Sequence, residues 1–216
     1  MGYTDMPGMD INKLDSGMFS DVLDCLGYRH QIIPGFLRNH RGIKCLGRAR
    51  TLELEAMETD DERIKMGLTF LGTILPGEIL LVKGSDQFAY FGEMMTKLST
   101  RQGIGGVVID GLTRDTNYTH QDFVQLPILA RGYSPVDIKG RGRVKATDVA
   151  IEIDSVLIHT GDLIFVDNEA ICVVPKEIEI LAIESIQQKV AEEARITELI
   201  QGNIGIEEML KIVKEF

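Results

Sequence analysis

Arg114 and Asp115, side by side in the middle of the chain, are residues whose types and position could do chemistry. They follow a short apolar run, residues 107–109, which lies between glycines and favours a buried strand. The pair Asp110-Gly111 is typical of a turn, so we expect the strand to end there. Ligands of α/β sheets bind just beyond the carboxyl ends of strands, where this arginine and aspartate would lie. An adjacent arginine and aspartate can also be a solvated ion pair at a helix start, so the pair needs a second signal.

Glu93 supplies that second signal. Twenty residues separate it from Arg114, which gives the pattern Glu-x20-Arg-Asp. Together with residues 76–80 and 130–137, this pattern strongly resembles one family, which contains the class II 4-hydroxy-4-methyl-2-oxoglutarate/4-carboxy-4-hydroxy-2-oxoadipate aldolases and the regulator of ribonuclease activity A. The resemblance covers roughly residues 15 to 180. Within this family, the acidic-x20-Arg-Asp spacing marks the metal-dependent aldolases rather than the regulators.

The resemblance implies a role for each residue of the pattern. Asp115 would ligate Mg²⁺ or Mn²⁺, hard cations that accept one carboxylate and keep several waters. Arg114 would bind a 2-oxo acid with its planar fork of donors and offset the charge of the enolate. Glu93 would hold and deprotonate a metal-bound water, which then acts as the base on the substrate hydroxyl.

Residues 92–95 would form the socket for the substrate carboxylate, because backbone N–H groups at a helix start bind anions. This substrate-binding set comprises Gly92, Glu93, Met94 and Met95, together with Arg114. The better-known aldolases carry leucines after the acidic residue, whereas this chain carries the two methionines. Because the backbone makes the contact, we expect the socket to survive, and we expect both methionine side chains to pack in the core.

The implied activity is that of a divalent-metal-dependent lyase. It would cleave a 4-hydroxy-2-oxo acid to pyruvate and a second carbonyl compound, and oxaloacetate decarboxylation would be a side activity, since it passes through the same pyruvate enolate. The alternative is a non-catalytic protein that binds and inhibits a ribonuclease. Glu93 together with Asp115 favours the enzyme, since a pure binding protein needs neither. The acceptor half of the substrate, the choice between Mg²⁺ and Mn²⁺ and the contributions of a neighbouring subunit stay open.

Other candidate groups have ordinary explanations. Lys83 follows an apolar run and could form a Schiff base, but we favour the interpretation that it is a solvated lysine at the end of a strand. The histidines lie far apart without the spacing of metal ligands, and His120, near Asp115, is expected at the surface. Residues 140–143, Gly-Arg-Gly-Arg, match neither a P-loop nor a dinucleotide motif, so we expect a turn between strands.

Composition narrows the function classes further. The 216 residues, 44% of them hydrophobic, suffice for one sizeable core, and one domain over residues 1–216 is the simplest expectation. A net charge of −10 argues against a nucleic-acid-binding surface. The three cysteines are odd in number and far apart, which disfavours disulfides or structural zinc and fits a reducing cytoplasm. We expect neither a secretory signal nor a membrane span.

The elements that must position these residues are read from periodicity. Helices are expected at residues 16–27, 59–72, from about Tyr90, from Pro175 and at 206–216; strands at 45–57, 78–82, 106–110 and 127–130; and a β-rich stretch at 144–174. Residues 32–36 read as a turn-rich connection. The fold class is therefore α/β (α+β), with a β-rich second half and a C-terminal helical extension over residues 176–216. The resemblance sharpens this to a swivelling β/β/α-type domain that assembles into homotrimers or dimers of trimers.

Overall fold

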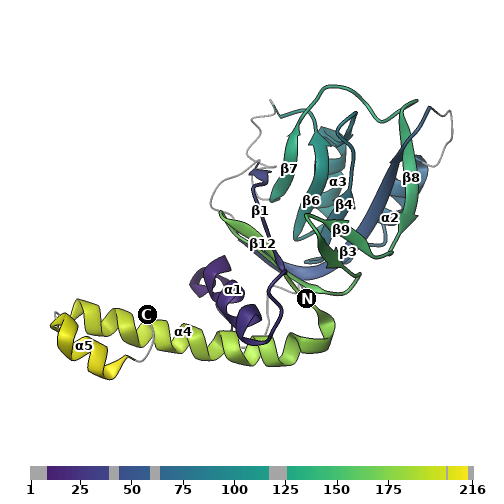
Figure 1. Cartoon of the computed structure of the whole chain (residues 1–216). Helices are drawn as coiled ribbons and strands as arrows, with labels where there is room; N and C mark the ends of the chain where they lie inside the picture. The colour runs from purple at the N-terminus through teal and green to yellow at the C-terminus, as the bar shows by residue number, and fades with distance from the viewer. Residues whose placement is uncertain (1–8, 39–43, 59–63, 117–125, 203, 214–216) are drawn as a thin grey trace.

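The computed structural model describes residues 9–38, 44–58, 64–116, 126–202 and 204–213, and its centre is a mixed β-sheet (Figure 1). Ten strands form this sheet, and the main path runs β1-β12-β11-β3-β4-β6-β7-β2, with β5 paired to β6 and β8 paired to β3. The predicted mixed α/β class with a β-rich second half is confirmed.

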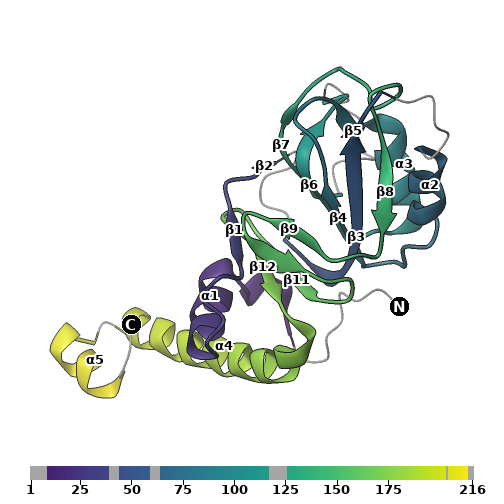
Figure 2. The same ribbon diagram turned by 45° about the vertical axis from the view of Figure 1, so that its right-hand side comes forward.

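The parallel part of the sheet carries the candidate residues. It consists of β3 (Cys45–Ala56), β4 (Ile79–Lys83), β6 (Gly106–Thr113) and β7 (Ile128–Tyr133), and the short strand β5 (Ala89–Phe91) extends the ladder beside β6. Helices α2 (Ile64–Leu71) and α3 (Glu93–Gln102) cover one face (Figure 2). Phe70 and Leu71 of α2 and Met95 and Leu98 of α3 pack there against strand residues such as Val107.

The opposite face is covered by β structure. The hairpin β9 (Ile151–Ile153) and β10 (Val156–Ile158) buries Ile153 and Ile158 against Leu81 and Val108 of the parallel strands. The antiparallel strands β11 (Leu163–Val166), β12 (Ala170–Val174) and β1 (Ile32–Pro34) continue the sheet away from the parallel part. Strands β8 (Gly142–Thr147) and β2 (Leu37–Arg38) complete the pairings with β3 and β7.

Helices at the two ends of the chain pack together on the antiparallel strands. Asp15 caps α1 (Ser16–Cys25) by accepting from the Met18 amide at 2.9 Å, as the sequence predicts. Helix α4 (Glu179–Gln201) buries Ala182 and Ile186 in the hydrophobic cluster that α1 forms with β11 and β12. The far half of α4 extends away from the sheet and leads to α5 (Ile206–Ile212) (Figure 1).

Three expected boundaries differ from the structure. Strand β6 does not end at Asp110-Gly111 but runs on to Thr113: Asp110 still pairs with Lys83 of β4, and after an irregularity at this point Leu112 and Thr113 pair with β5 and β7. Helix α3 begins at Glu93 rather than Tyr90, because Tyr90 lies in the unexpected strand β5. Residues of the connection at 32–36 form β1 against β12. The expected start of α2, residues 59–63, lies outside the described residues.

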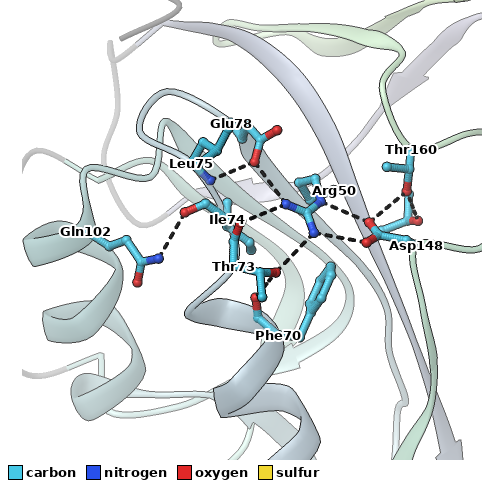
Figure 3. Close-up of polar contacts among 10 residues, drawn as sticks. Arg50, Phe70, Thr73, Ile74, Leu75, Glu78, Gln102, Asp148 and Thr160 are labelled. Atoms are coloured by element: carbon cyan, nitrogen blue, oxygen red, sulfur yellow. Dashed lines mark hydrogen bonds and ion pairs between the residues drawn. The ribbon is translucent and has the colours of Figure 1, made fainter. Parts of the chain in front are cut away.

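Near the amino-terminal end of β4, Arg50 of β3 forms hydrogen bonds with residues of several loops (Figure 3). Its guanidinium donates to Asp148 at 2.9 Å, to Glu78 at 3.1 Å and to the Thr73 carbonyl at 3.1 Å. The hydrogen bonds that Arg50 donates to Asp148 raise the pKa of Arg50 against the opposing effect of burial. Nearby, Gln102 at the end of α3 donates to the Ile74 carbonyl at 2.9 Å, which fixes the helix end farthest from Arg114.

Candidate active site

The parallel pairing of β5 and β6 brings together residues that lie far apart in the sequence. Phe91 is the register partner of Thr113, so both strands end at the same edge of the sheet. The Phe91 carbonyl accepts from the Arg114 amide at 2.9 Å and from the Thr113 hydroxyl at 2.7 Å. The chain then turns into α3 after Phe91 and into Arg114 and Asp115 after Thr113, which explains the Glu-x20-Arg-Asp spacing.

Gly92, the residue between β5 and α3, lies against both members of the Arg-Asp pair. A Cβ atom built on Gly92 would be 2.4 Å from Asp115 Oδ2 and 3.0 Å from Arg114 Cγ. The backbone of Gly92 is extended, with φ −146° and ψ −165°, so the position needs glycine for space and not for conformation. A larger residue would displace the two side chains.

Asp115 takes the place of a capping side chain for α3. Its Oδ2 accepts a hydrogen bond from the Glu93 amide at 3.1 Å, while Gly92 at the cap position has no side chain to do so. The residue has a φ of 60°, a left-handed conformation that aspartate adopts more readily than most residues. The side chain is 46% exposed, so its remaining oxygen lone pairs face solvent. The carboxylate therefore sits at the positive end of the helix dipole with room for a further ligand.

The next residues of α3 point in different directions. Glu93 forms an ion pair with Lys97, one helical turn later, at 2.5 Å and is 33% exposed. Met95 packs against the core, as expected, but Met94 is 62% exposed, so the expectation of core packing is wrong for Met94. Helical periodicity explains the difference, since adjacent positions lie about 100° apart around the axis.

Arg114 has a second acidic partner that the sequence reasoning assigned no role. Its Nη1 lies 3.0 Å from Oδ2 of Asp137, and its Nε lies 3.6 Å from Oδ2 of Asp115. Asp137 belongs to the segment 130–137, which contributed to the family resemblance. In the sequence, Asp137 is marked only as a polar residue that follows an expected strand. The structure shows that this strand, β7, lies beside β6, and spacing alone does not give that order.

Charge at the site favours a cation. The three carboxylates of Glu93, Asp115 and Asp137 outnumber the two cations of Arg114 and Lys97 by one. Within the part of the chain that the structure describes, no three His, Cys, Asp or Glu side chains converge as a group of metal ligands. Any cation here would therefore rely on few protein oxygens and on water.

The other candidate groups lie elsewhere. Lys83 and Asp110 are register partners on β4 and β6, and Lys83 Nζ donates to Asp110 Oδ2 at 2.6 Å. Arg131 of β7 completes this group through Asp110 at 3.0 Å and Asp154 at 2.6 Å. Of the expected turn at 140–143, residues 142 and 143 already belong to β8. His120 lies outside the described residues.

Two further observations concern the cysteines and the helices. Cys25, Cys45 and Cys172 form no disulfide with one another, and burial raises the pKa of the Cys172 thiol well above its usual range. None of the helices in the described ranges is both long and apolar enough to cross a membrane.

Comparison with known proteins places the chain in a family. Residues 17–173 match the family described as RraA-like, Aldolase/RraA. The chain belongs to the RraA-like family. The resemblance drawn from Glu93, Arg114 and Asp115 is therefore confirmed at the level of the family, which includes both aldolases and ribonuclease regulators.

Individual RraA-like relatives are distant. Protein DlpA of Legionella pneumophila is 22% identical over 165 residues, which cover 76% of this chain and 26% of DlpA. A Halalkalibacterium halodurans protein provisionally named 4-hydroxy-4-methyl-2-oxoglutarate aldolase is 28% identical over 131 residues. That match covers 60% of this chain and 61% of the relative, so the chain spans only part of the length of both relatives.

Solved structures support the same placement. The crystal structure of Streptomyces coelicolor RraAS2, described as an unusual member of the RNase ES inhibitor RraA protein family, matches with a TM-score of 0.74. The sequences are 27% identical, and the match covers 88% of this chain and 93% of RraAS2.

Proposed function

We propose that this RraA-like protein is a divalent-metal-dependent lyase that cleaves a 4-hydroxy-2-oxo acid to pyruvate and a second carbonyl compound. One observation carries the proposal: the carboxylate of Asp115, the guanidinium of Arg114 and the first amide of α3 meet within hydrogen-bonding or ion-pair distance. A hard-cation ligand, a carboxylate-binding fork and an anion-binding helix start are the parts that a 2-oxo acid needs. The aldolase-named relative points the same way.

The residues present fit the implied metal. Asp115 offers a half-exposed oxygen ligand, Glu93 carries a second carboxylate on the residue whose amide binds Asp115, and the five described groups Glu93, Lys97, Arg114, Asp115 and Asp137 carry one negative charge in excess. Mg²⁺ and Mn²⁺ prefer such oxygen ligands and retain water in their remaining positions. When bound, such a cation supplies Lewis-acid polarisation of the ketone oxygen, a role worth several kcal/mol in related chemistry.

The protein groups would divide the remaining work. Arg114 binds the 2-oxo acid and offsets negative charge that develops on the ketone oxygen. The amides at the start of α3 hold the substrate carboxylate. Glu93, which is partly exposed to water, accepts the proton of the 4-hydroxyl through a water molecule.

Bond cleavage then follows from proton transfer. As the hydroxyl loses its proton, its oxygen forms the new carbonyl group and the C3–C4 bond breaks. The electron pair of that bond passes to C3 as the pyruvate enolate, which takes up a proton to give pyruvate. Decarboxylation of oxaloacetate yields the same enolate and is the expected side activity.

The decisive experiment measures pyruvate release with lactate dehydrogenase as the coupling enzyme. Wild-type protein receives 4-hydroxy-4-methyl-2-oxoglutarate or oxaloacetate, each with Mg²⁺ and again with excess EDTA. We expect release with Mg²⁺, its loss in EDTA and its loss in Asp115→Asn, whereas Asp154→Asn, the same change in another exposed ion pair, stays active. No release from either substrate by a folded wild-type protein would refute the proposal for these substrates.

The likeness to RraAS2 supports a second candidate, a protein that inhibits a ribonuclease by direct contact. In that case the protein would slow RNA cleavage by a partner ribonuclease, and Asp115→Asn would inhibit as well as the wild type.

A homotrimer or a dimer of trimers is proposed under either function and is tested by sedimentation equilibrium.

A further inference from the structure

The segment after β7 reaches back over the candidate site and is held in place there. The Ser134 amide donates to the Thr113 carbonyl at 3.0 Å, and the Ala89 amide donates to the Val136 carbonyl at 2.8 Å. Asp137 forms an isolated parallel bridge with Ala89, and the next residue, Ile138, is only 2% exposed. The segment is thus anchored to β5 and β6, the two strands that deliver the rest of the site.

Asp137 itself has a defined orientation. Its Oδ1 accepts from the Lys139 amide at 3.3 Å, and its Oδ2 lies 3.0 Å from Nη1 of Arg114. Its backbone carbonyl accepts from Arg141 at 3.3 Å. The carboxylate is therefore aimed at Arg114 by its own loop and is not a freely moving surface group.

Two contacts at different nitrogens fix the plane of the Arg114 guanidinium. Asp137 binds Nη1, while Asp115 lies 3.6 Å from Nε. The guanidinium is a rigid planar fork, so two such contacts define the direction in which its remaining donors point. An arginine that must meet a planar 2-oxo acid depends on this direction, because misplacement by about 1 Å can cost on the order of 100-fold in rate.

We propose that Asp137 is a positioning residue, which acts on the 2-oxo acid through Arg114 and not by contact with substrate or metal. This role rests on the proposed lyase function. For anion binding after removal of Asp137, it predicts the opposite of what charge alone predicts. Removing a negative charge from a site should strengthen binding of an anion, whereas loss of positioning should weaken it.

The test compares Asp137→Ala and Asp137→Asn with the wild type, with Asp154→Asn as the matched control. Asp154 is 44% exposed and pairs with Arg131, much as Asp137, 42% exposed, pairs with Arg114. The probes are Mn²⁺ alone, followed by paramagnetic resonance, and oxalate in the presence of Mn²⁺, followed by calorimetry. Oxalate is a planar dianion that resembles the pyruvate enolate.

For Asp137→Ala we expect oxalate affinity to fall by about tenfold to 100-fold, the range typical for partners that orient a ligating group. Mn²⁺ affinity should change by no more than about threefold, since one charge at a distance is largely screened. Asp137→Asn keeps an acceptor oxygen and should recover part of the oxalate affinity, and Asp154→Asn should match the wild type. Unchanged or tighter oxalate binding by Asp137→Ala, or an equal loss of both affinities, would overturn the proposal.

A second readout needs no ligand. The ¹⁵N side-chain resonance of Arg114, assigned by its loss in Arg114→Lys, reports how freely the guanidinium rotates. We expect slow rotation in the wild type and faster rotation in Asp137→Ala, and equal rotation in both would overturn the proposal. If the wild type neither binds oxalate nor releases pyruvate, the lyase function fails, and this resonance alone decides whether Asp137 holds Arg114.

Discussion

Gly92→Ala is the substitution that tests the candidate site most directly, because it adds one methyl group where β5 meets α3. The new Cβ would lie 2.4 Å from Asp115 Oδ2 and 3.1 Å from Arg114 Nε. The backbone at Gly92 is extended, so alanine introduces no conformational strain. The methyl group therefore acts on Asp115 and Arg114 through contact alone.

The size of the effect follows from these distances. To restore an ordinary contact from 2.4 Å, Asp115 Oδ2 must move by about 1 Å, which the rotation of one exposed side chain permits. The movement breaks the 3.1 Å hydrogen bond to the Glu93 amide, which costs about 1 kcal/mol at a helix start. The protein should fold, while a displacement of this size in a catalytic carboxylate should lower kcat/KM by about 100-fold.

Pyruvate release and thermal unfolding together measure both effects. Gly205→Ala is the matched control, since Gly205 also occupies the cap position of a helix, α5, and a Cβ there would meet nothing within 4 Å. We expect Gly205→Ala to keep wild-type kcat/KM. A Gly92→Ala variant that folds and retains full activity would show that the observed placement of Asp115 and Arg114 is not needed for turnover.

Three further predictions concern charge and stability. Arg114→Lys keeps the charge but loses the fork, so kcat/KM for pyruvate release should fall by at least about tenfold while the melting temperature stays near that of the wild type. Arg50→Met leaves Glu78, 12% exposed, without its cation, so urea unfolding should show a loss of about 3 kcal/mol with kcat unchanged; a large fall in kcat would contradict the separation of Arg50 from the site. Although burial alone would raise it, hydrogen bonds from the Glu169, Ser16 and Ala170 amides lower the pKa of Asp167 below its ordinary 3.8. The unfolded chain then binds the proton more tightly than the folded protein does, so protonation of Asp167 favours unfolding. In urea unfolding, the stability advantage of wild type over Asp167→Asn should therefore be full above about pH 5 and vanish as pH falls through the folded pKa. An advantage that grows toward low pH would refute this.

Local signals in the sequence were sufficient for most of the fold. The cap at Asp15, the apolar runs of β3, β4 and β11, and the β-rich second half follow from residue type and period. Strand β5 was missed because its three residues, 89–91, are too short to show alternation, and their apolar character continues into the helical pattern of α3. The pair Asp110-Gly111 predicts a turn, yet Gly111 lies in β6, where a Cβ would meet the Ser85 amide nitrogen at 2.6 Å. Such a close backbone approach leaves no trace in a single sequence.

The candidate residues were found because their spacing resembles a family pattern, but their arrangement depends on pairing between strands. The pattern Glu-x20-Arg-Asp indicated that Glu93, Arg114 and Asp115 belong together, and whether they act as proposed stays a prediction. The contact of Asp137 with Arg114 could not be predicted, because it requires that the segment after β7 crosses back onto β5. Met94 shows the converse error: an apolar residue in an amphipathic pattern lies 62% exposed at the start of α3.

The charges around Arg114 argue for an order in which ligands bind. Asp115 and Asp137 both pair with the arginine, and Glu93 is paired with Lys97, so these five described groups carry one negative charge in excess, which would disfavour a 2-oxo acid on its own. A divalent cation at Asp115 would reverse the sign of this balance and leave Arg114 and the α3 amides in a field that attracts carboxylates. Under the proposed metal role, the same acidic groups that disfavour an anion alone would make anion binding conditional on a cation. In a protein with a net charge of −10, this local reversal is what would allow an acidic substrate to bind at all.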